Sequence, residues 1–162
     1  MPDIHMPKID RLGEQLTSLL GKETTVSESA GPNAFEADCH TARYFTRDDR
    51  LAALCQVDLA VAAFLGAALA MVPAGGAEEA VKEGELGANL IDAYSEVANI
   101  MAGLLCADGY PHVRWVSVAK SLDALTDDDK AIVAGPKQRI DVEIEIEGYG
   151  GGKMTILSAD IG

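Results

Sequence analysis

Residues 139–159, RIDVEIEIEGYGGGKMTILSA, contain the clearest secondary-structure signal in the chain. Isoleucine and valine alternate with acidic residues from Arg139 to Glu147, and this period of two is typical of a half-buried β-strand. A glycine-rich stretch, residues 148–152, follows, and Lys153 to Ala159 is again suited to a strand, so the segment predicts an antiparallel hairpin. The acidic side chains of the first strand are then expected to form an ordinary solvated sheet face.

The rest of the chain alternates between strand and helix patterns. Strands are expected at residues 24–29, 34–46, 51–57 and 112–118, and helices at residues 7–20, 58–72 and about 84–105. Residues 73–85 are predicted to be a linker with at most a helical turn, and residues 121–130 an acidic loop. We therefore expect one α+β domain over residues 1–162, with a short flexible N-terminus of about residues 1–6. Its mostly antiparallel sheet should be covered on one face by helices.

The chain of 162 residues has 13 basic and 26 acidic side chains, a formal net charge of -13 at pH 7. Such a surface repels phosphate backbones and anionic lipid headgroups, which argues against a nucleic-acid partner. The longest apolar stretch, residues 59–72, falls short of the roughly 20 residues that cross a bilayer, so a buried helix without membrane insertion is expected. The first ten residues lack a signal-peptide pattern, which favours a cytoplasmic location.

Cysteine and histidine are few and scattered, at positions 39, 55 and 106 and at positions 5, 40 and 112 respectively. No Cys-x-x-Cys pair or metal-ligand spacing links them, so the sequence predicts reduced thiols, no intrinsic metal site and no intrinsic cofactor. A nucleophile elbow and a P-loop are also missing from the sequence. Any catalysis is therefore expected to depend on polar side chains grouped in another way.

Residues 88–105, ANLIDAYSEVANIMAGLL, sort into two faces at about 100° per residue. The apolar stripe consists of Leu86, Leu90, Tyr94, Val97, Met101 and Leu105. The opposite face holds Asp92, Glu96, Asn99 and Gly103 within an arc of roughly 60°, and we call these four residues the motif ridge. A solvated helix face would explain two carboxylates and an amide without any function, and this interpretation stays open here.

Two residues of the motif ridge favour a docking role. Asn99 and Gly103 are poor helix formers, each less favourable than alanine by several tenths to about 1 kcal/mol. A glycine on the outer face also allows a backbone or a phosphate to approach closely. We therefore expect a docking ridge, although helical geometry alone does not identify its chemistry.

The motif ridge resembles a known family. The pattern Asp92-x-x-x-Glu96-x-x-Asn99, with Gly103 four residues beyond the asparagine, is similar to the motif helix of the CheC/CheX/FliY family of chemotaxis phosphatases. The expected element order is also similar, with a helix, three strands, an apolar helix, the motif helix and further strands. The likeness covers most of the chain and is nearest to the single-motif CheX-like branch. It implies a CheC/CheX-like fold and a possible homodimer.

The resemblance also implies a function, which is hydrolysis of the aspartyl phosphate of a CheY-like response regulator. By resemblance, Glu96 anchors the partner through its active-site lysine, and Asn99 orients the attacking water. Asp92 has a supporting role, and Mg²⁺ belongs to the partner receiver domain. Phosphoryl transfer depends on positioning more than on covalent chemistry, which suits a carboxamide that can donate and accept.

The sequence departs from the family in one place. Family members usually have a proline roughly two dozen residues after the asparagine, in the following strand, but residues 113–125 here, VRWVSVAKSLDAL, contain none. A second hypothesis is therefore a weak or inactive module of the same fold that binds a response regulator or a flagellar-switch component. A third is a structural homo-oligomer, with the motif ridge in the seam between copies.

Two further features bear on the partner. The first helix repeats the motif spacing as Asp10, Glu14, Thr17 and Gly21, but threonine lacks the reach of a carboxamide, so we predict no second active ridge. Arg114 and Lys120 are the nearest basic residues after the motif helix and are candidate contacts for an acidic regulator. Because both proteins would be acidic, we expect modest affinity with a weak or inverse salt dependence.

Overall fold

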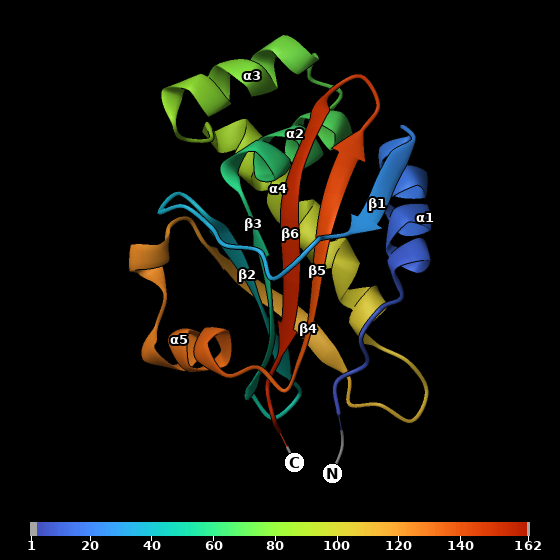
Figure 1. Cartoon of the computed structure of the whole chain (residues 1–162), viewed down its shortest axis with the longest axis vertical. Helices are drawn as coiled ribbons and strands as arrows, with labels where there is room; N and C mark the ends of the chain where they lie inside the picture. Colours follow the sequence, from blue (N-terminus) through green and yellow to red (C-terminus); the bar gives the residue numbers. More distant parts are fainter. Residues whose placement is uncertain (1–2, 162) are drawn as a thin grey trace.

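The computed structural model describes residues 3–161 and has the expected α+β architecture. Over these residues, six strands form one antiparallel sheet in the order β1-β5-β6-β3-β2-β4 (Figure 1). The strands are β1 (Thr24–Glu28), β2 (His40–Thr46), β3 (Leu51–Val57), β4 (Val113–Ala119), β5 (Gln138–Ile146) and β6 (Gly150–Ser158). The edge strands are β1 and β4, and pairing of such an edge into a homodimer stays a prediction.

The hairpin predicted from residues 139–159 is formed by β5 and β6. Val142 lies opposite Met154 and Ile144 opposite Gly152, so the antiparallel register runs through the glycine-rich stretch. The apolar residues of β5 face inward as predicted, with Val142, Ile144 and Ile146 buried in the core. The period-two pattern therefore determined both the hairpin and the side of the sheet that faces the core.

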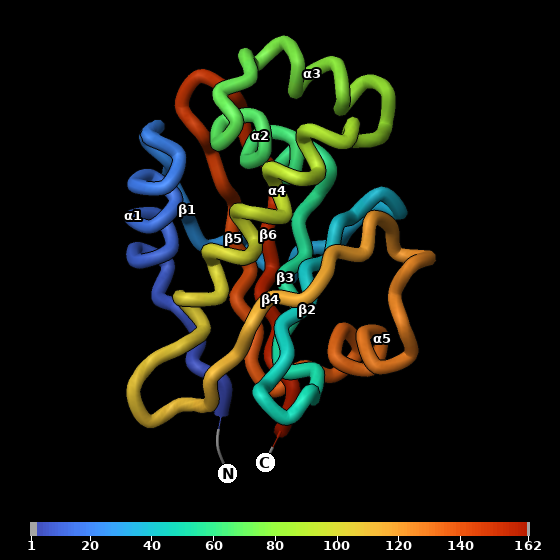
Figure 2. Tube along the Cα trace, turned by 180° about the vertical axis from the view of Figure 1, so that it is seen from behind, coloured from blue at the N-terminus to red at the C-terminus, as the bar shows by residue number. Residues whose placement is uncertain are grey.

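One face of the sheet carries a helical layer. It consists of α1 (Ile9–Leu20), α2 (Leu59–Ala70) and α4 (Ala88–Met101), seen from behind in Figure 2. Nine residues of α2 are buried, as expected for its uniformly apolar sequence. Leu12, Leu16 and Leu20 of α1 and the apolar stripe of α4 join the same core cluster as the inward side chains of the sheet.

Two segments form helices that were not predicted. Residues 73–85 contain α3 (Ala74–Glu83), whose small residues Ala77 and Ala80 are buried. Residues 121–130 contain a short 3₁₀ turn, η2 (Leu122–Ala124), and the start of α5 (Asp127–Ala134). Thr126 and Asp129 begin α5 with a reciprocal capping box, in which each side chain accepts from the other's backbone amide.

Helix α5 packs against the opposite face of the sheet, so that face is partly covered as well. Ile132 of α5 contacts Leu54 and Leu157 in a small separate cluster. Arg43 forms an ion pair of 2.8 Å with Asp129, whose side chain is 0% exposed. One carboxylate of this acidic segment, that of Asp129, is therefore buried and has a structural role.

The expected strand over residues 34–46 begins only at His40. Before it, the chain crosses the outer face of β5 and β6, and Asn33 fixes this crossing (Figure 1). The Asn33 amide donates to the carbonyls of Val142 and Met154 at 3.3 and 3.0 Å. Residues 34–39 consequently lie outside the sheet ladder despite their partial alternation.

The N-terminal segment differs from the expectation of a flexible residues 1–6. Ile4 is 1% exposed and belongs to the main core cluster. His5 Nδ1 lies 2.9 Å from the carbonyl oxygen of Leu104, and Asp3 forms an ion pair with Lys137. Residues 1 and 2, part of the same expectation, lie outside the described residues.

Candidate functional site

The outer face of α4 presents the polar residues of the motif ridge. Asp92, Glu96 and Asn99 are all exposed, and all three belong to α4, which runs from Ala88 to Met101. Within residues 3–161, none of these three side chains takes part in a hydrogen bond or an ion pair. The face therefore offers two carboxylates and a carboxamide that are free to meet a partner.

The inner face of α4 is held by close packing against α2. Leu90, Tyr94, Val97 and Met101 are buried, as the apolar stripe predicts. Gly66 of α2 lies under α4, where a Cβ would be only 2.6 Å from the Leu90 carbonyl oxygen. The missing side chain at this position allows the two helix backbones to approach, and it sets the height of the motif ridge above the sheet.

A buried tyrosine fixes the C-terminal half of α4. Tyr44 of β2 is 1% exposed, and its hydroxyl donates to the Ala98 carbonyl oxygen at 2.6 Å. The amide of Ala102 bonds to the carbonyl oxygen of Asn99, three residues back, which marks a tightening into a 3₁₀ turn. Tyr44 thus holds the helix beside Asn99, where the regular hydrogen-bond ladder ends.

The structure changes the interpretation of Gly103. The helix expected over about residues 84–105 ends at Met101, and Gly103 lies in the 3₁₀ turn η1 (Ala102–Leu105). Gly103 is exposed, and a Cβ there would meet no atom of the described chain within 4 Å. The predicted position of Gly103 in the middle of a helix is therefore wrong, and packing within the described residues does not explain the glycine either.

The first helix uses its matching residues for structure. Thr17 accepts a hydrogen bond from the Thr24 amide at 3.0 Å and fastens α1 to β1. Gly21 adopts a left-handed conformation with φ of 67° and ends the helix, as its position predicts. Because Thr17 is engaged in this way, the face of α1 lacks a counterpart of the free Asn99 side chain.

The scattered cysteines and histidines do not form a site. Cys39 and Cys55 are buried, and burial raises the pKa of each thiol to about 12, so both stay protonated. In residues 3–161, no group of three or more His, Cys, Asp or Glu side chains is placed to hold a metal ion. Helices in the same range are all too short or too polar to span a membrane.

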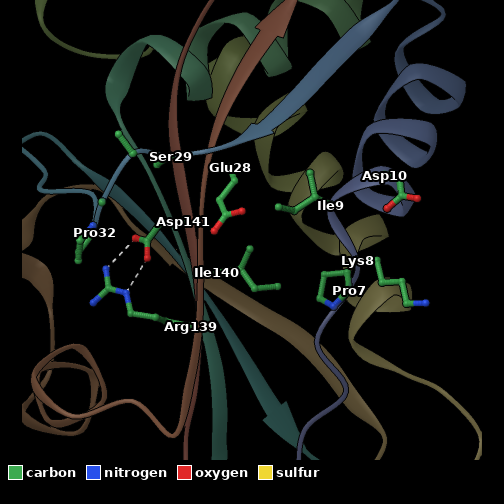
Figure 3. Close-up of a pocket in the computed structure, with 12 residues that line it drawn as sticks. Pro7, Lys8, Ile9, Asp10, Glu28, Ser29, Pro32, Arg139, Ile140 and Asp141 are labelled. Atoms are coloured by element: carbon green, nitrogen blue, oxygen red, sulfur yellow. Dashed lines mark hydrogen bonds and ion pairs between the residues drawn. The ribbon is translucent and has the colours of Figure 1, made fainter.

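A recess of about 650 Å³ opens between the start of α1 and the ends of β1 and β5 (Figure 3). Its charged pair, Arg139 and Asp141, is joined by two hydrogen bonds of 2.8 Å. Burial disfavours the charged form of Asp141, but hydrogen bonds from Arg139, Asn33 and Thr155 outweigh burial and hold its pKa below the ordinary value. These charges satisfy one another, so we assign the pair a structural role.

Of the two basic residues that follow the motif helix in sequence, Arg114 is engaged in an ion pair, whereas Lys120 lies near the start of α4. Arg114 of β4 is paired with Asp49 in the turn after β2. Lys120 lies beside the start of α4, where it lines a recess with Ile91 and Asp123. The cations beside the C-terminal end of the motif ridge are Lys8 and Arg11, from the N-cap and first turn of α1. Sequence spacing could not reveal this, because the two segments are far apart in the chain.

The chain has the fold of solved FliY and FliM domains. It resembles FliY from Thermotoga maritima, with a TM-score of 0.60, 16% identity and coverage of 98% of this chain and 86% of that one. It also resembles a chain in the structure of the FliG–FliM complex from H. pylori, with a TM-score of 0.54 and 12% identity. That match covers 93% of this chain and 86% of the other. At these identities the likeness establishes the fold alone. No protein family and no curated protein matches the sequence.

Proposed function

We propose that this protein is a phosphatase that hydrolyses the aspartyl phosphate of a CheY-like response regulator. The observation that carries the proposal is the exposed face of α4, where Glu96 and Asn99 project without partners among the described residues. They are one helical turn apart, so a single receiver domain can engage both. The likeness of the whole chain to the FliY fold supports the same conclusion.

In the proposed reaction, Asn99 positions water for in-line attack on phosphorus. Its Oδ1 accepts a hydrogen bond from the water, while its Nδ2 can donate to a phosphoryl oxygen. The new bond forms between the water oxygen and phosphorus, and the bond between phosphorus and the aspartyl oxygen breaks. The products are inorganic phosphate and the free aspartate, with the water proton released to phosphate or solvent. An acyl phosphate is reactive enough that positioning can supply the rate enhancement.

The carboxylates of α4 orient the partner in this proposal. Glu96 pairs with the lysine beside the phosphorylated aspartate of the receiver, and Asp92 supports this contact one turn earlier. Such a pair at a partly dehydrated interface contributes more than an ordinary surface ion pair. Mg²⁺ would be held by the receiver domain, and we assign no residue of this chain to it.

Gly103 fits the same arrangement. A side chain at this position would not clash with any described residue, since no atom lies within 4 Å of a Cβ built there. The glycine is then best explained by a neighbour outside the chain that approaches the turn after Asn99 closely. We propose that this neighbour is the response regulator, which would bind in the cytoplasm with its phosphoryl group over Asn99.

A second candidate function is docking of a response regulator or a flagellar-switch component without hydrolysis. Two observations favour it. The helix tightens into a 3₁₀ turn directly after Met101, and β4 has no proline, so the regulator could sit differently over Asn99. One of the similar structures is also that of a complex between FliG and FliM from H. pylori.

The two functions are separated by dephosphorylation of receiver domains encoded in the same genome. Phosphate loss is followed with the wild type, Asn99→Ala and Glu96→Ala, together with binding of each variant to the beryllofluoride-activated receiver. A phosphatase predicts that Asn99→Ala lowers kcat by about 10²-fold or more with little change in binding. Glu96→Ala should mainly weaken binding, because it removes the anchoring contact.

The matched control is Glu78→Ala, which removes an exposed carboxylate from α3 instead of α4. It should leave both the rate and the affinity near the wild-type values. If the wild type binds a receiver but never speeds its loss of phosphate, the docking function replaces the phosphatase. If it binds no activated receiver at all, both functions are wrong.

A further inference from the structure

A recess of about 400 Å³ lies beside the end of the motif ridge and has a basic lining. It is formed by His5, Pro7, Lys8 and Arg11 on one side and by Gly103, Leu104, Cys106 and Ala107 on the other. We call it the basic recess. Within the part of the chain that the structure describes, its lining includes no acidic residue. In a chain with a net charge of -13, this is a local reversal of sign at the motif ridge.

Both cations of the basic recess are available to a partner. Lys8 is exposed and forms no ion pair within residues 3–161, and Figure 3 shows its side chain extending away from Arg139 and Asp141. Arg11 contacts Glu14 at 3.6 Å, but the two side chains are 71% and 68% exposed. An exposed pair of this kind contributes little, so Arg11 can exchange Glu14 for another carboxylate.

The basic recess is held in a fixed position next to the motif ridge. His5 Nδ1 donates to the Leu104 carbonyl oxygen at 2.9 Å, and its ring packs edge-on against Tyr110 with 5.0 Å between centroids. These contacts fasten the N-terminal segment to the turn that contains Gly103. Gly103 lies four positions after Asn99, which corresponds to roughly 6 to 8 Å along the axis. A receiver seated over Asn99 would therefore also cover the basic recess.

We propose that the basic recess is a second contact for the receiver domain, where Lys8 and Arg11 bind carboxylates on the rim of its phosphorylation pocket. This inference rests on the proposed function. The rim of that pocket is acidic, and Asp92 and Glu96 would repel it if they faced it. When Lys8 and Arg11 face the carboxylates of the rim, Glu96 is left free for the receiver lysine. The two cations lie beyond the C-terminal end of α4 and the two carboxylates lie on α4, and this arrangement fixes the direction of docking.

The proposal also changes the expected response to salt. Two acidic proteins repel each other overall, and the sequence alone predicted a weak or inverse salt dependence. Lys8 and Arg11 add a local attraction that is strongest at low ionic strength. Removing them should therefore weaken binding most at low salt, and this loss should shrink as the salt concentration rises.

The test compares the double variant Lys8→Ala/Arg11→Ala with the control Lys130→Ala/Lys153→Ala. The control removes the same total charge from exposed positions on α5 and β6. Binding of the full chain to the beryllofluoride-activated receiver is measured at about 0.05 M and about 0.5 M NaCl, where the Debye lengths differ severalfold. Melting curves check that both variants are folded.

We expect the Lys8/Arg11 variant to bind roughly three- to tenfold more weakly at low salt, with a much smaller difference at high salt. The affinity of the control variant should change only by the amount that its change in net charge causes. Equal affinities of the variant and the control at low salt would overturn the proposed role of the basic recess and would leave the proposed phosphatase function unaffected. Failure of the wild type to bind any activated receiver would instead overturn the proposed function.

Discussion

The contact between Gly66 and α4 gives a quantitative prediction about the position of the motif ridge. In Gly66→Ala, the new Cβ would lie 2.6 Å from the Leu90 carbonyl oxygen and 3.3 Å from the Tyr94 amide nitrogen. Ordinary contact begins at 3.4 Å, so the first distance is about 0.8 Å too short. Both neighbours are backbone atoms of α4 and cannot rotate away. The helix must therefore move outward by several tenths of an ångström.

The expected loss of stability follows from two opposing effects. Overpacking of this kind is unfavourable by about 1 to 3 kcal/mol, and alanine in place of glycine regains up to about 1 kcal/mol of helix propensity. We therefore expect the free energy of unfolding to fall by about 1 to 2 kcal/mol. For a chain of this size, Tm should then drop by roughly 2 to 8 °C.

The same displacement should reduce function, because Asn99 lies on the moved helix. A shift approaching 1 Å at a positioning residue can lower the rate by up to about 10²-fold. Calorimetry and receiver dephosphorylation measure the two effects on the same sample. Gly75→Ala is the matched control, since Gly75 is a helical glycine of α3 with no neighbour within 4 Å of a Cβ. If Gly66→Ala were as stable and as active as Gly75→Ala, the close approach would not position the motif ridge.

Three other substitutions test the supports of the fold. Tyr44→Phe leaves the Ala98 carbonyl without its 2.6 Å hydrogen bond, and denaturant unfolding should show a loss of about 1 to 2 kcal/mol. Burial lowers the pKa of His40 below its ordinary 6.5, so the unfolded chain binds the proton first. The free energy of unfolding should thus decrease as the pH falls below about 6.5, and His40→Gln should flatten that dependence. Arg43→Met leaves the Asp129 carboxylate buried without its cation and should destabilise the protein by about 3 to 5 kcal/mol in thermal or denaturant unfolding. An unchanged melting curve for Arg43→Met would contradict this role for the ion pair.

The sequence predicted the parts of the fold that follow a regular period. The alternation from Arg139 to Glu147 located β5 and its buried face, and the 3.6-residue period of α4 separated the motif ridge from the core. In both elements, residues that face the core and residues that face solvent recur at a fixed spacing. Local sequence is therefore sufficient to predict the element and its buried face. The exposure of Asp92, Glu96 and Asn99 follows from that period, whereas their roles stay predictions.

The sequence could not predict elements whose stabilisation comes from distant residues. The start of α5 has a local signal in the Thr126-x-x-Asp129 capping box, but the pairing of the buried Asp129 carboxylate with Arg43 of β2 has none. Residues 34–39 alternate like a strand but leave the sheet, because Asn33 bonds to β5 and β6 over a hundred residues away. The basic recess likewise joins the first residues of the chain to the turn after α4. None of these contacts has a local signal.

The most direct test of the account is the single-turnover rate of receiver dephosphorylation by Asn99→Ala at saturating protein concentration. At saturation the measured rate no longer depends on affinity, so it reports the positioning of water alone. The account predicts a rate close to that of the receiver without phosphatase, while the variant still binds the activated receiver as the wild type does. A rate equal to that of the wild type would contradict the central claim that the Asn99 side chain carries the reaction.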